Sequence, residues 1–216
     1  MRVTYLGGLF SLLFIISVGI NCSYAIDSNA SESMGWSGIY DEAIMAYDEA
    51  IRLHPEDPDA WYNKGYALQS QGKYDDAIKA YDEAIRLDQY NADYWYKKGF
   101  ALEALGKYNE AIAVYDKAIE LNPENESYRG AKGNALKVLG KWDEAIYAYD
   151  EALRLNKSFL DAWVNKGNAL EAKGNALEAE GEHDEAISAY NKAIYAYDEA
   201  LKFDPENEEA WYGKGY

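Results

Sequence analysis

A period of 34 residues constrains this chain more than any other feature of its sequence. Four segments align when the chain is shifted by that length, and one aligned position holds Trp61, Trp95, Arg129 and Trp163. Self-similarity at such a period is typical of repeat proteins, whose units bury their apolar faces against their neighbours. The sequence therefore predicts a row of similar units instead of a single closed core.

Each unit predicts two helices, so we expect an all-α fold. In the first complete unit the helices are expected from near Trp61 to Ser70 and from about Asp75 to Leu87, where apolar residues recur every three or four positions. Gly72 separates them, as glycine often does in a turn. Residues that favour helix starts precede the units: Asp57, Asn91 and Asn125.

A glycine recurs inside every first helix, where it costs roughly 1 kcal/mol relative to alanine. These glycines are Gly65, Gly99, Gly133 and Gly167. A cost that is repeated needs a repeated gain, and we expect that gain from close approach of the second helix. The expected contacts are Ala77, Ala111 and Ala145, with Tyr81, Tyr115 and Tyr149 filling the adjoining space.

These residues resemble the tetratricopeptide repeat (TPR) family, whose signature spaces six residue types over 34 positions. The matching residues in one unit are Trp95, Gly99, Ala111, Tyr115, Ala118 and Pro123. The resemblance covers about residues 38–216 and implies a solenoid of stacked antiparallel helix hairpins that form a right-handed superhelix. The departures from the signature are Gln89 and Lys157 in place of the turn proline, Arg129 in place of tryptophan, and lysine just before each repeated glycine.

The expected units are unequal in length. They are a second helix alone at 38–57, complete units at 58–91, 92–125 and 126–159, an extended unit at 160–207, and a truncated first helix at 208–216. Solenoids normally cover their last apolar face with a capping helix. Because the chain stops inside a first helix, we expect either a truncated end or a partner there.

Two duplicated heptads lengthen the extended unit: GNALEAK is followed by GNALEAE from residue 167, and AISAYNK by AIYAYDE from residue 186. Seven residues turn a helix to within about 20° of two full turns. Both arms of one hairpin should therefore lengthen together, by roughly 10.5 Å. We expect a new packed layer of Gly174, Ala176 and Leu177 against Tyr190, Ala193 and Ile194.

Such a tip would project beyond its neighbours and expose some of Leu177, Ile187 and Tyr190. Two interpretations stay open for it. The tip is a docking or self-association site, or it is a tolerated duplication without a role.

The first 25 residues predict a secretory signal peptide. An uncharged apolar run from Leu6 to Ile20 ends in the small residues Ser23 to Ala25, as signal peptidase prefers. We therefore expect an exported protein, at the cell surface, in a periplasm-like space or outside the cell, with a polar linker at 26–37. The alternative is a membrane anchor, because residues 3–20 are just long enough to span a bilayer.

The formal charge of −17 argues against several classes of partner. Such a surface repels phosphate backbones and anionic lipids, so we expect no nucleic acid and no membrane contact except through an uncleaved N-terminal segment. A protein or peptide partner that is neutral or basic fits better. No catalytic residue, metal or cofactor is expected, since His54 and His183 fall in predicted turns without ligand spacing and no strand precedes a phosphate loop.

The family resemblance implies that the first helices line a concave groove that accepts a peptide. Aromatic rings supply contact area and amides satisfy backbone groups, which suits peptide recognition. The alternative is that these positions are exposed residues without a ligand. The groove candidates are Tyr62, Asn63, Tyr66, Tyr96, Lys97, Phe100, Asn134, Val164, Asn165 and Asn168.

TPR domains that hold chaperone C-termini use lysine, asparagine and arginine at defined groove positions. The matching places in this chain hold Tyr62, Tyr66, Lys97, Ser127 and Ala131, so that carboxylate clamp is absent. The expected function is a non-catalytic protein-interaction scaffold. The alternatives are an assembly arm of a larger enzyme or secretion complex whose activity lies elsewhere, and a self-associating repeat module.

Overall fold

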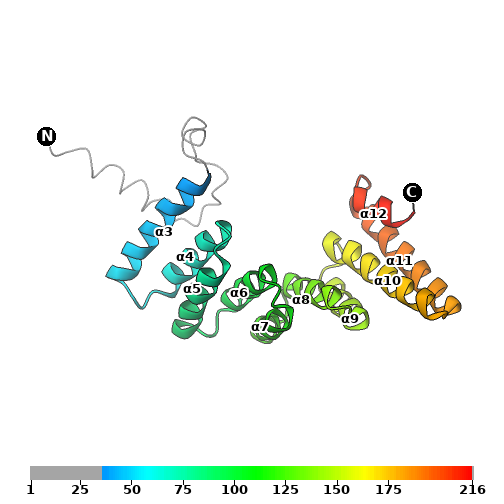
Figure 1. Ribbon diagram of the computed structural model, residues 1–216, viewed down its shortest axis with the longest axis horizontal. Coiled ribbons are helices and arrows are strands. Elements are labelled where there is room, and N and C mark those ends of the chain that lie inside the picture. The colour runs from blue at the N-terminus through cyan, green and yellow to red at the C-terminus, as the bar shows by residue number, and fades with distance from the viewer. Residues whose placement is uncertain (1–35, 216) are drawn as a thin grey trace. The chain divides into compact units, whose positions relative to one another are not determined.

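The computed structural model describes residues 36–215, and every regular element among them is a helix (Figure 1). The chain divides into two units, residues 1–42 and 43–216, and the packing below concerns the second. The signal peptide, the anchor and nearly all of the linker lie outside the described residues. Within the described part of the chain, no helix combines the length and the apolarity needed to cross a bilayer.

The helices follow the repeat closely. They are α3 (Trp36–Leu53), α4 (Pro58–Ser70), α5 (Tyr74–Leu87), α6 (Ala92–Ala104), α7 (Tyr108–Leu121), α8 (Glu126–Val138), α9 (Trp142–Leu155), α10 (Leu160–Glu180), α11 (His183–Phe203) and α12 (Glu208–Gly213). From α4 to α11 they pair as successive hairpins, and each hairpin packs on the next (Figure 1). The all-α solenoid of stacked hairpins is confirmed, and the right-handed sense of a superhelix stays a prediction.

Side-chain caps begin three of the helices as the sequence predicted. Asp57, Asn91 and Asn125 each accept a hydrogen bond from the backbone N–H two residues later, at 3.0, 3.0 and 2.9 Å. Asn207 caps α12 by accepting from the N–H three residues later, that of Ala210, at 2.9 Å. These bonds satisfy N–H groups that have no partner within the helix.

The repeated glycine faces a tyrosine of the second helix, so the expected close approach of that helix is observed. A Cβ on Gly65 would lie 2.7 Å from the ring of Tyr81, and the equivalent glycines of the later units meet their own tyrosines in the same way. The nearest group to each glycine is therefore a fully buried tyrosine ring. Ala77 and its equivalents are also fully buried, but the tyrosine ring lies closer to the glycine.

The tryptophans have matching surroundings. The indole N–H of Trp61, Trp95, Trp163 and Trp211 donates to the carbonyl six residues earlier, at 2.9 to 3.2 Å. Arg129 stands in the tryptophan position, and its guanidinium donates to the equivalent carbonyl, that of Pro123. The turn that precedes each first helix is therefore held by one bond, whichever side chain supplies it.

The lysine that departs from the family pattern joins neighbouring units. Each one forms an ion pair of 2.6 Å with an aspartate of the preceding second helix: Lys64 with Asp48, Lys98 with Asp82, Lys132 with Asp116, Lys166 with Asp150, and Lys214 with Asp198. Exposed ion pairs contribute about 0–1 kcal/mol each. The five pairs therefore add little stability, and they repeat the same contact at each junction between hairpins.

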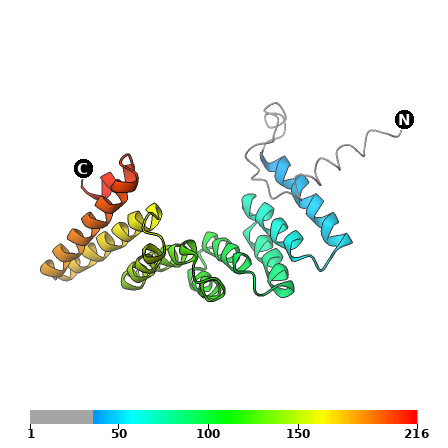
Figure 2. The same cartoon turned by 180° about the vertical axis from the view of Figure 1, so that it is seen from behind.

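The duplicated heptads lengthen both arms of one hairpin, as expected. Helices α10 and α11 have 21 residues each, against 13 or 14 in the hairpins from α4 to α9, and they run side by side (Figure 2). The second copy repeats the internal packing, because a Cβ on Gly174 would lie 2.6 Å from the ring of Tyr190. Ile194 was expected in the new layer but is 39% exposed, and Ile187 is 56% exposed.

Candidate functional site

A pocket of about 280 Å³ lies between the first helices α6, α8 and α10, with Tyr149 of α9 at its base. Gly130 and Phe159 both line it: a Cβ on Gly130 would lie 2.9 Å from the Phe159 ring, so a larger residue at position 130 would displace that ring. The polar and aromatic side chains of the lining include Tyr96, Phe100, Ser127, Asn134, Asp161 and Asn165. Four of these side chains were predicted from the sequence to line the peptide groove. We therefore call this site the groove pocket.

The side of the groove pocket toward α6 is aromatic. The ring centroid of Tyr96 lies 4.9 Å from Phe100, 5.9 Å from Tyr115 and 4.7 Å from Tyr128. Rings held at such tilted or edge-on angles stabilise one another by about 0.5–1.5 kcal/mol per pair beyond the area they bury. Tyr96 is therefore fixed in place before any ligand arrives.

Lys97 lies over this aromatic surface. Its ammonium is 5.4 Å from the ring centroid of Tyr66, 5.9 Å from that of Tyr96 and 5.8 Å from that of Phe100. A cation within about 6 Å of a ring face is attracted by the ring quadrupole. Lys97 is thus held by three rings of α4 and α6.

The aromatic surface continues to α4 through tyrosines. The ring centroid of Tyr62 lies 5.9 Å from that of Tyr81 and 5.1 Å from that of Tyr94. Burial raises the pKa of Tyr62 and of Tyr96 to about 12, so both hydroxyls stay neutral hydrogen-bonding groups near pH 7. The hydroxyls of Tyr94 and Tyr128 donate to Asp59 and Asp93 of the preceding first helix, each at 2.6 Å.

The side of the groove pocket toward α10 is formed by amides. The Oδ1 of Asn134 accepts a hydrogen bond from the Tyr149 hydroxyl at 2.7 Å, and the Oδ1 of Asn165 accepts one from the Lys137 ammonium at 2.6 Å. Asn165 also donates to the carbonyl of Asp161 at 2.9 Å. A side-chain amide offers two donors and two acceptor positions, so these internal bonds orient the groups and leave capacity for a ligand backbone.

A row of polar residues, one turn further along each first helix, was not predicted from the sequence. It consists of Gln69, Glu103, Lys137 and Glu171, and it meets the buried tyrosines: the Tyr81 hydroxyl donates to Gln69 at 2.9 Å and the Tyr197 hydroxyl to Glu171 at 3.1 Å. The residues are 34 apart, so the alignment of units would have found them had polar positions been compared as well as apolar ones.

Glu103 is the titratable group of this row that burial changes most clearly. Burial raises the pKa of the Glu103 carboxyl to about 7, and the Tyr115 hydroxyl acts in the opposite direction. The Tyr115 hydroxyl is close enough to Glu103 to lower its pKa, but the two groups do not meet the geometric criteria for a hydrogen bond. Within the described part of the chain this buried hydroxyl has no hydrogen-bond partner. Burial also lowers the pKa of Lys137.

The structure brings together most, not all, of the predicted groove residues. Tyr96, Phe100, Asn134 and Asn165 line the groove pocket, and Tyr66 and Lys97 join it through the ring and cation contacts. Tyr62 and Asn63, on α4, do not line the groove pocket. Asn168 does not line it either, and its amide is bonded to the Tyr197 hydroxyl and the Glu209 carboxylate. Val164 is only 4% exposed and packs in the core, away from the surface the others share.

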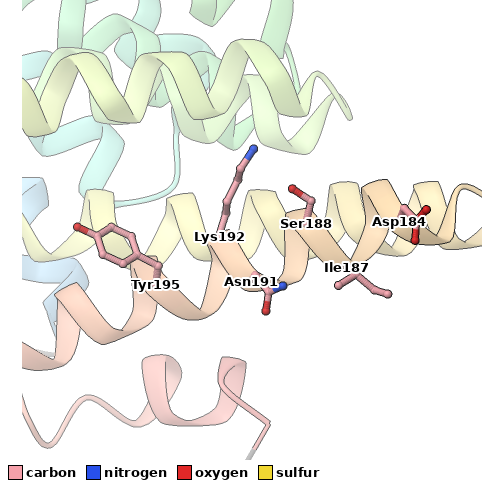
Figure 3. Close-up of a pocket in the computed structure, with 6 residues that line it drawn as sticks. All are labelled: Asp184, Ile187, Ser188, Asn191, Lys192 and Tyr195. Carbon is pink, nitrogen blue, oxygen red and sulfur yellow. The ribbon is translucent and has the colours of Figure 1, made fainter.

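A second hollow, on the extended hairpin, has a different character. It measures about 460 Å³, and its six side chains all leave a single helix, α11 (Figure 3). A hollow on one helix face has no opposing wall that could enclose a ligand. Among residues 36–215, no group of three or more histidine, cysteine or acidic side chains is placed to hold a metal ion.

Comparison with known families follows the observed repeat. Tetratricopeptide repeat models match residues 37–92, 65–126 and 123–199, and a TPR repeat model matches residues 189–216. Together the matches run without a gap from residue 37 to residue 216. No protein with a curated description matches the chain in sequence.

Solved structures of similar fold are numerous. A crystal structure of the MamA protein superposes with a TM-score of 0.63 at 25% identity, over 82% of this chain and 91% of that one. YrrB, described as a TPR protein with an unusual peptide-binding site, superposes with a TM-score of 0.64 at 23% identity, over 87% and 90%. The first TPR of Spaghetti (RPAP3), bound to the HSP90 peptide SRMEEVD, superposes with a TM-score of 0.52 at 27% identity, over 53% and 91%.

Proposed function

This chain belongs to the tetratricopeptide repeat family, and we propose that it is a non-catalytic scaffold that binds a peptide segment of another protein in its groove pocket. One observation carries the proposal: the pocket places the fixed rings of Tyr96 and Phe100 opposite the oriented amides of Asn134 and Asn165. Rings supply contact area at little entropic cost, and amides can bond a peptide backbone. The peptide-bound TPR of Spaghetti supports this class of function.

The ligand is proposed to be neutral or basic. Asp161 lines the groove pocket, Glu103 lies near its rings, and the chain carries a formal charge of −17. Of the nearby cations, Lys97 is held over three rings and Lys137 is bonded to Asn165. The peptide in the Spaghetti complex ends in EEVD, which carries three acidic side chains, whereas this chain has Ser127 and Ala131 where the clamp of such domains has basic residues. The same charge disfavours a nucleic acid.

The site of action is proposed to be outside the cytoplasm. Support comes from the apolar run and the small residues of positions 1–25. N-terminal sequencing of the protein isolated from its native cells tests this: a mature chain that begins at Ile26 in an exported fraction is expected. An intact Met1 in the cytoplasmic fraction would contradict it.

Selection of random displayed peptides on the full chain tests the binding function. Enriched peptides are then synthesised and titrated against the wild type and four variants: Tyr96→Ala, Phe100→Ala, Asn165→Ala and Tyr90→Ala. Tyr90→Ala is the matched control, because Tyr90 is a 75% exposed tyrosine outside the groove pocket.

Tyr96→Ala and Phe100→Ala are each expected to weaken binding at least tenfold (about 1.4 kcal/mol), as truncation of a central aromatic anchor does. Asn165→Ala should weaken it less, and Tyr90→Ala should not change it. Far-UV circular dichroism shows which variants keep their helices. Equal affinity in all folded variants, or no enriched peptide at all, would contradict the proposal, and light scattering on the same samples tests the self-associating alternative.

A further inference from the structure

A pocket of about 520 Å³ lies between α7, α8 and α9, at the one unit in which Arg129 replaces the repeated tryptophan. Its apolar walls are Ile119 of α7, Leu136 of α8 and Tyr147 of α9. It shares no lining residue with the groove pocket. We call it the Arg129 pocket.

Trp163, the tryptophan of the following unit, shows what such walls accommodate. Its indole packs against the two core clusters that contain Leu153 and Leu170, the residues equivalent to Ile119 and Leu136. The ring centroid of Trp163 also lies 6.2 Å from that of Tyr195, edge to face, and Tyr195 is the equivalent of Tyr147. The Arg129 pocket therefore has the three walls that surround an indole elsewhere in the same chain.

Arg129 makes the hydrogen bond that tryptophan makes in the other units, but its side chain does not fill the space that an indole fills. Both side chains donate to the carbonyl six residues earlier, Trp163 to Lys157 at 2.9 Å and Arg129 to Pro123. That bond holds the guanidinium at the preceding turn. Within residues 36–215, none of the aromatic ring pairs involves Tyr147, and this side chain is 68% exposed.

The charges at the rim of the Arg129 pocket are balanced. Its lining includes the carboxylates Asp116, Asp143, Glu144 and Glu151 and the cations Arg129 and Lys132. Each carboxylate is paired with a cation: Asp116 with Lys132 at 2.6 Å, and Asp143, Glu144 and Glu151 with Lys173, Lys141 and Arg154. The Trp61 unit has the same four acids, Asp48, Asp75, Asp76 and Glu83, so the missing indole and not the charge distinguishes the Arg129 pocket.

We propose that the Arg129 pocket binds the aromatic side chain, best an indole, of a partner protein. The ring takes the place that Trp163 occupies in its own unit, against Ile119 and Leu136 and edge-on to Tyr147. The Arg129 guanidinium at the rim adds a cation–π contact. This binding is independent of the groove pocket, and either site can fail without the other.

Titration of the full chain with two capped tripeptides, Lys-Trp-Lys and Lys-Ala-Lys, tests the proposal. The indole of the first carries a fluorine so that its binding is followed by ¹⁹F NMR without interference from the chain's own tryptophans. Lys-Trp-Lys is expected to bind with a Kd of about 0.1–1 mM, the weak affinity of a single anchor. Lys-Ala-Lys, titrated by calorimetry, should bind at least tenfold more weakly.

Arg129→Trp fills the pocket with the chain's own indole and is expected to weaken Lys-Trp-Lys binding at least tenfold. Tyr147→Ala, a change at an exposed residue that leaves folding intact, should weaken it about threefold, in keeping with the loss of one edge-on ring contact. Trp163→Arg opens an equivalent pocket in the next unit and should add a second site. Tyr90→Ala is the control and should change nothing.

Two results would overturn the proposal. One is equal binding of Lys-Trp-Lys and Lys-Ala-Lys to the wild type, including no binding of either. The other is unchanged Lys-Trp-Lys binding by helical, folded Arg129→Trp and Tyr147→Ala chains.

Discussion

The hairpins α8–α9 and α10–α11 are neighbours with the same internal packing and different surfaces. In both, a glycine of the first helix receives a buried tyrosine ring, whose hydroxyl donates to an asparagine at 2.7 Å. The first hairpin has lost the indole between its helices and has a pocket there. The second keeps Trp163 and has gained seven residues in each arm.

The difference shows which positions the fold restrains. An exchange of tryptophan for arginine is tolerated because the hydrogen bond to the turn carbonyl persists. A heptad insertion is tolerated because it copies a complete packing unit, Gly174 with Tyr190, whose hydroxyl donates to Asn175 at 2.8 Å. Both changes leave the buried glycine–tyrosine contact intact.

The largest expected effect comes from filling that contact. Gly133→Val and Gly167→Val place a branched side chain into a fully buried tyrosine ring and should each lower the free energy of unfolding by about 3 kcal/mol. Gly174→Val strikes Tyr190, which is only half-buried and can move, so the loss there should be about 1 kcal/mol. Urea denaturation of the full chain, followed by circular dichroism, measures all three. Equal losses of unfolding free energy in Gly133→Val and Gly174→Val would contradict this difference between a fully buried and a half-buried tyrosine.

Heptad deletions give the next largest effect. Removal of 174–180 alone or of 186–192 alone leaves one arm unpaired and exposes an apolar strip, which should cost about 2 kcal/mol. Removal of both restores a hairpin of the same length as α8–α9 and should be at least as stable as either single deletion. The same urea titration decides the matter, and a double deletion less stable than both single ones would refute the matched-arm account.

Exchange of the indole between the two hairpins has a smaller effect. Trp163→Arg should lower the free energy of unfolding by about 1.5 kcal/mol, because the partly exposed indole is lost while the bond to the turn carbonyl persists. Arg129→Trp should raise it by about 1 kcal/mol, since it fills an existing cavity. Thermal melts of the two variants are sufficient for this comparison. A loss of stability in Arg129→Trp would mean that the pocket walls do not fit an indole.

The smallest expected effect comes from Glu103 of α6. It belongs to the row of polar residues that also includes Lys137 of α8 and Glu171 of α10. The pKa of Glu103 is raised to about 7 in the folded chain, so folding favours its protonated form. Its contribution makes stability fall as pH rises from about 5 to about 8, and Glu103→Gln should remove that fall. Because the group is partly exposed, the gain at pH 8 should be only about 1 kcal/mol. Urea midpoints of the variant and the wild type across this pH range measure it, and identical profiles would contradict the assigned pKa.

The architecture was predictable because its signals are local and repeated. Trp61, Gly65 and their equivalents fix the unit length, and Asp57, Asn91 and Asn125 mark helix starts through their own side chains. The groove pocket was predictable in part, since Tyr96 and Asn134 occupy half-buried positions of first helices that the family resemblance assigns to the groove.

Three features depend on contacts between units and could not be predicted. The ring of Phe159 fills the space beside Gly130, Val164 packs in the core, and burial raises the pKa of Glu103. Each depends on how closely two helices that are distant in sequence approach one another, which a repeat period does not specify.

Hydrogen–deuterium exchange of the full chain, with and without a peptide selected on it, tests the central claim that the first helices form the binding surface. Added protection is expected in α6, α8 and α10, which supply most of the lining of the groove pocket, and not in α7. Protection confined to α7 and α9, with α6 and α10 unchanged, would contradict the account.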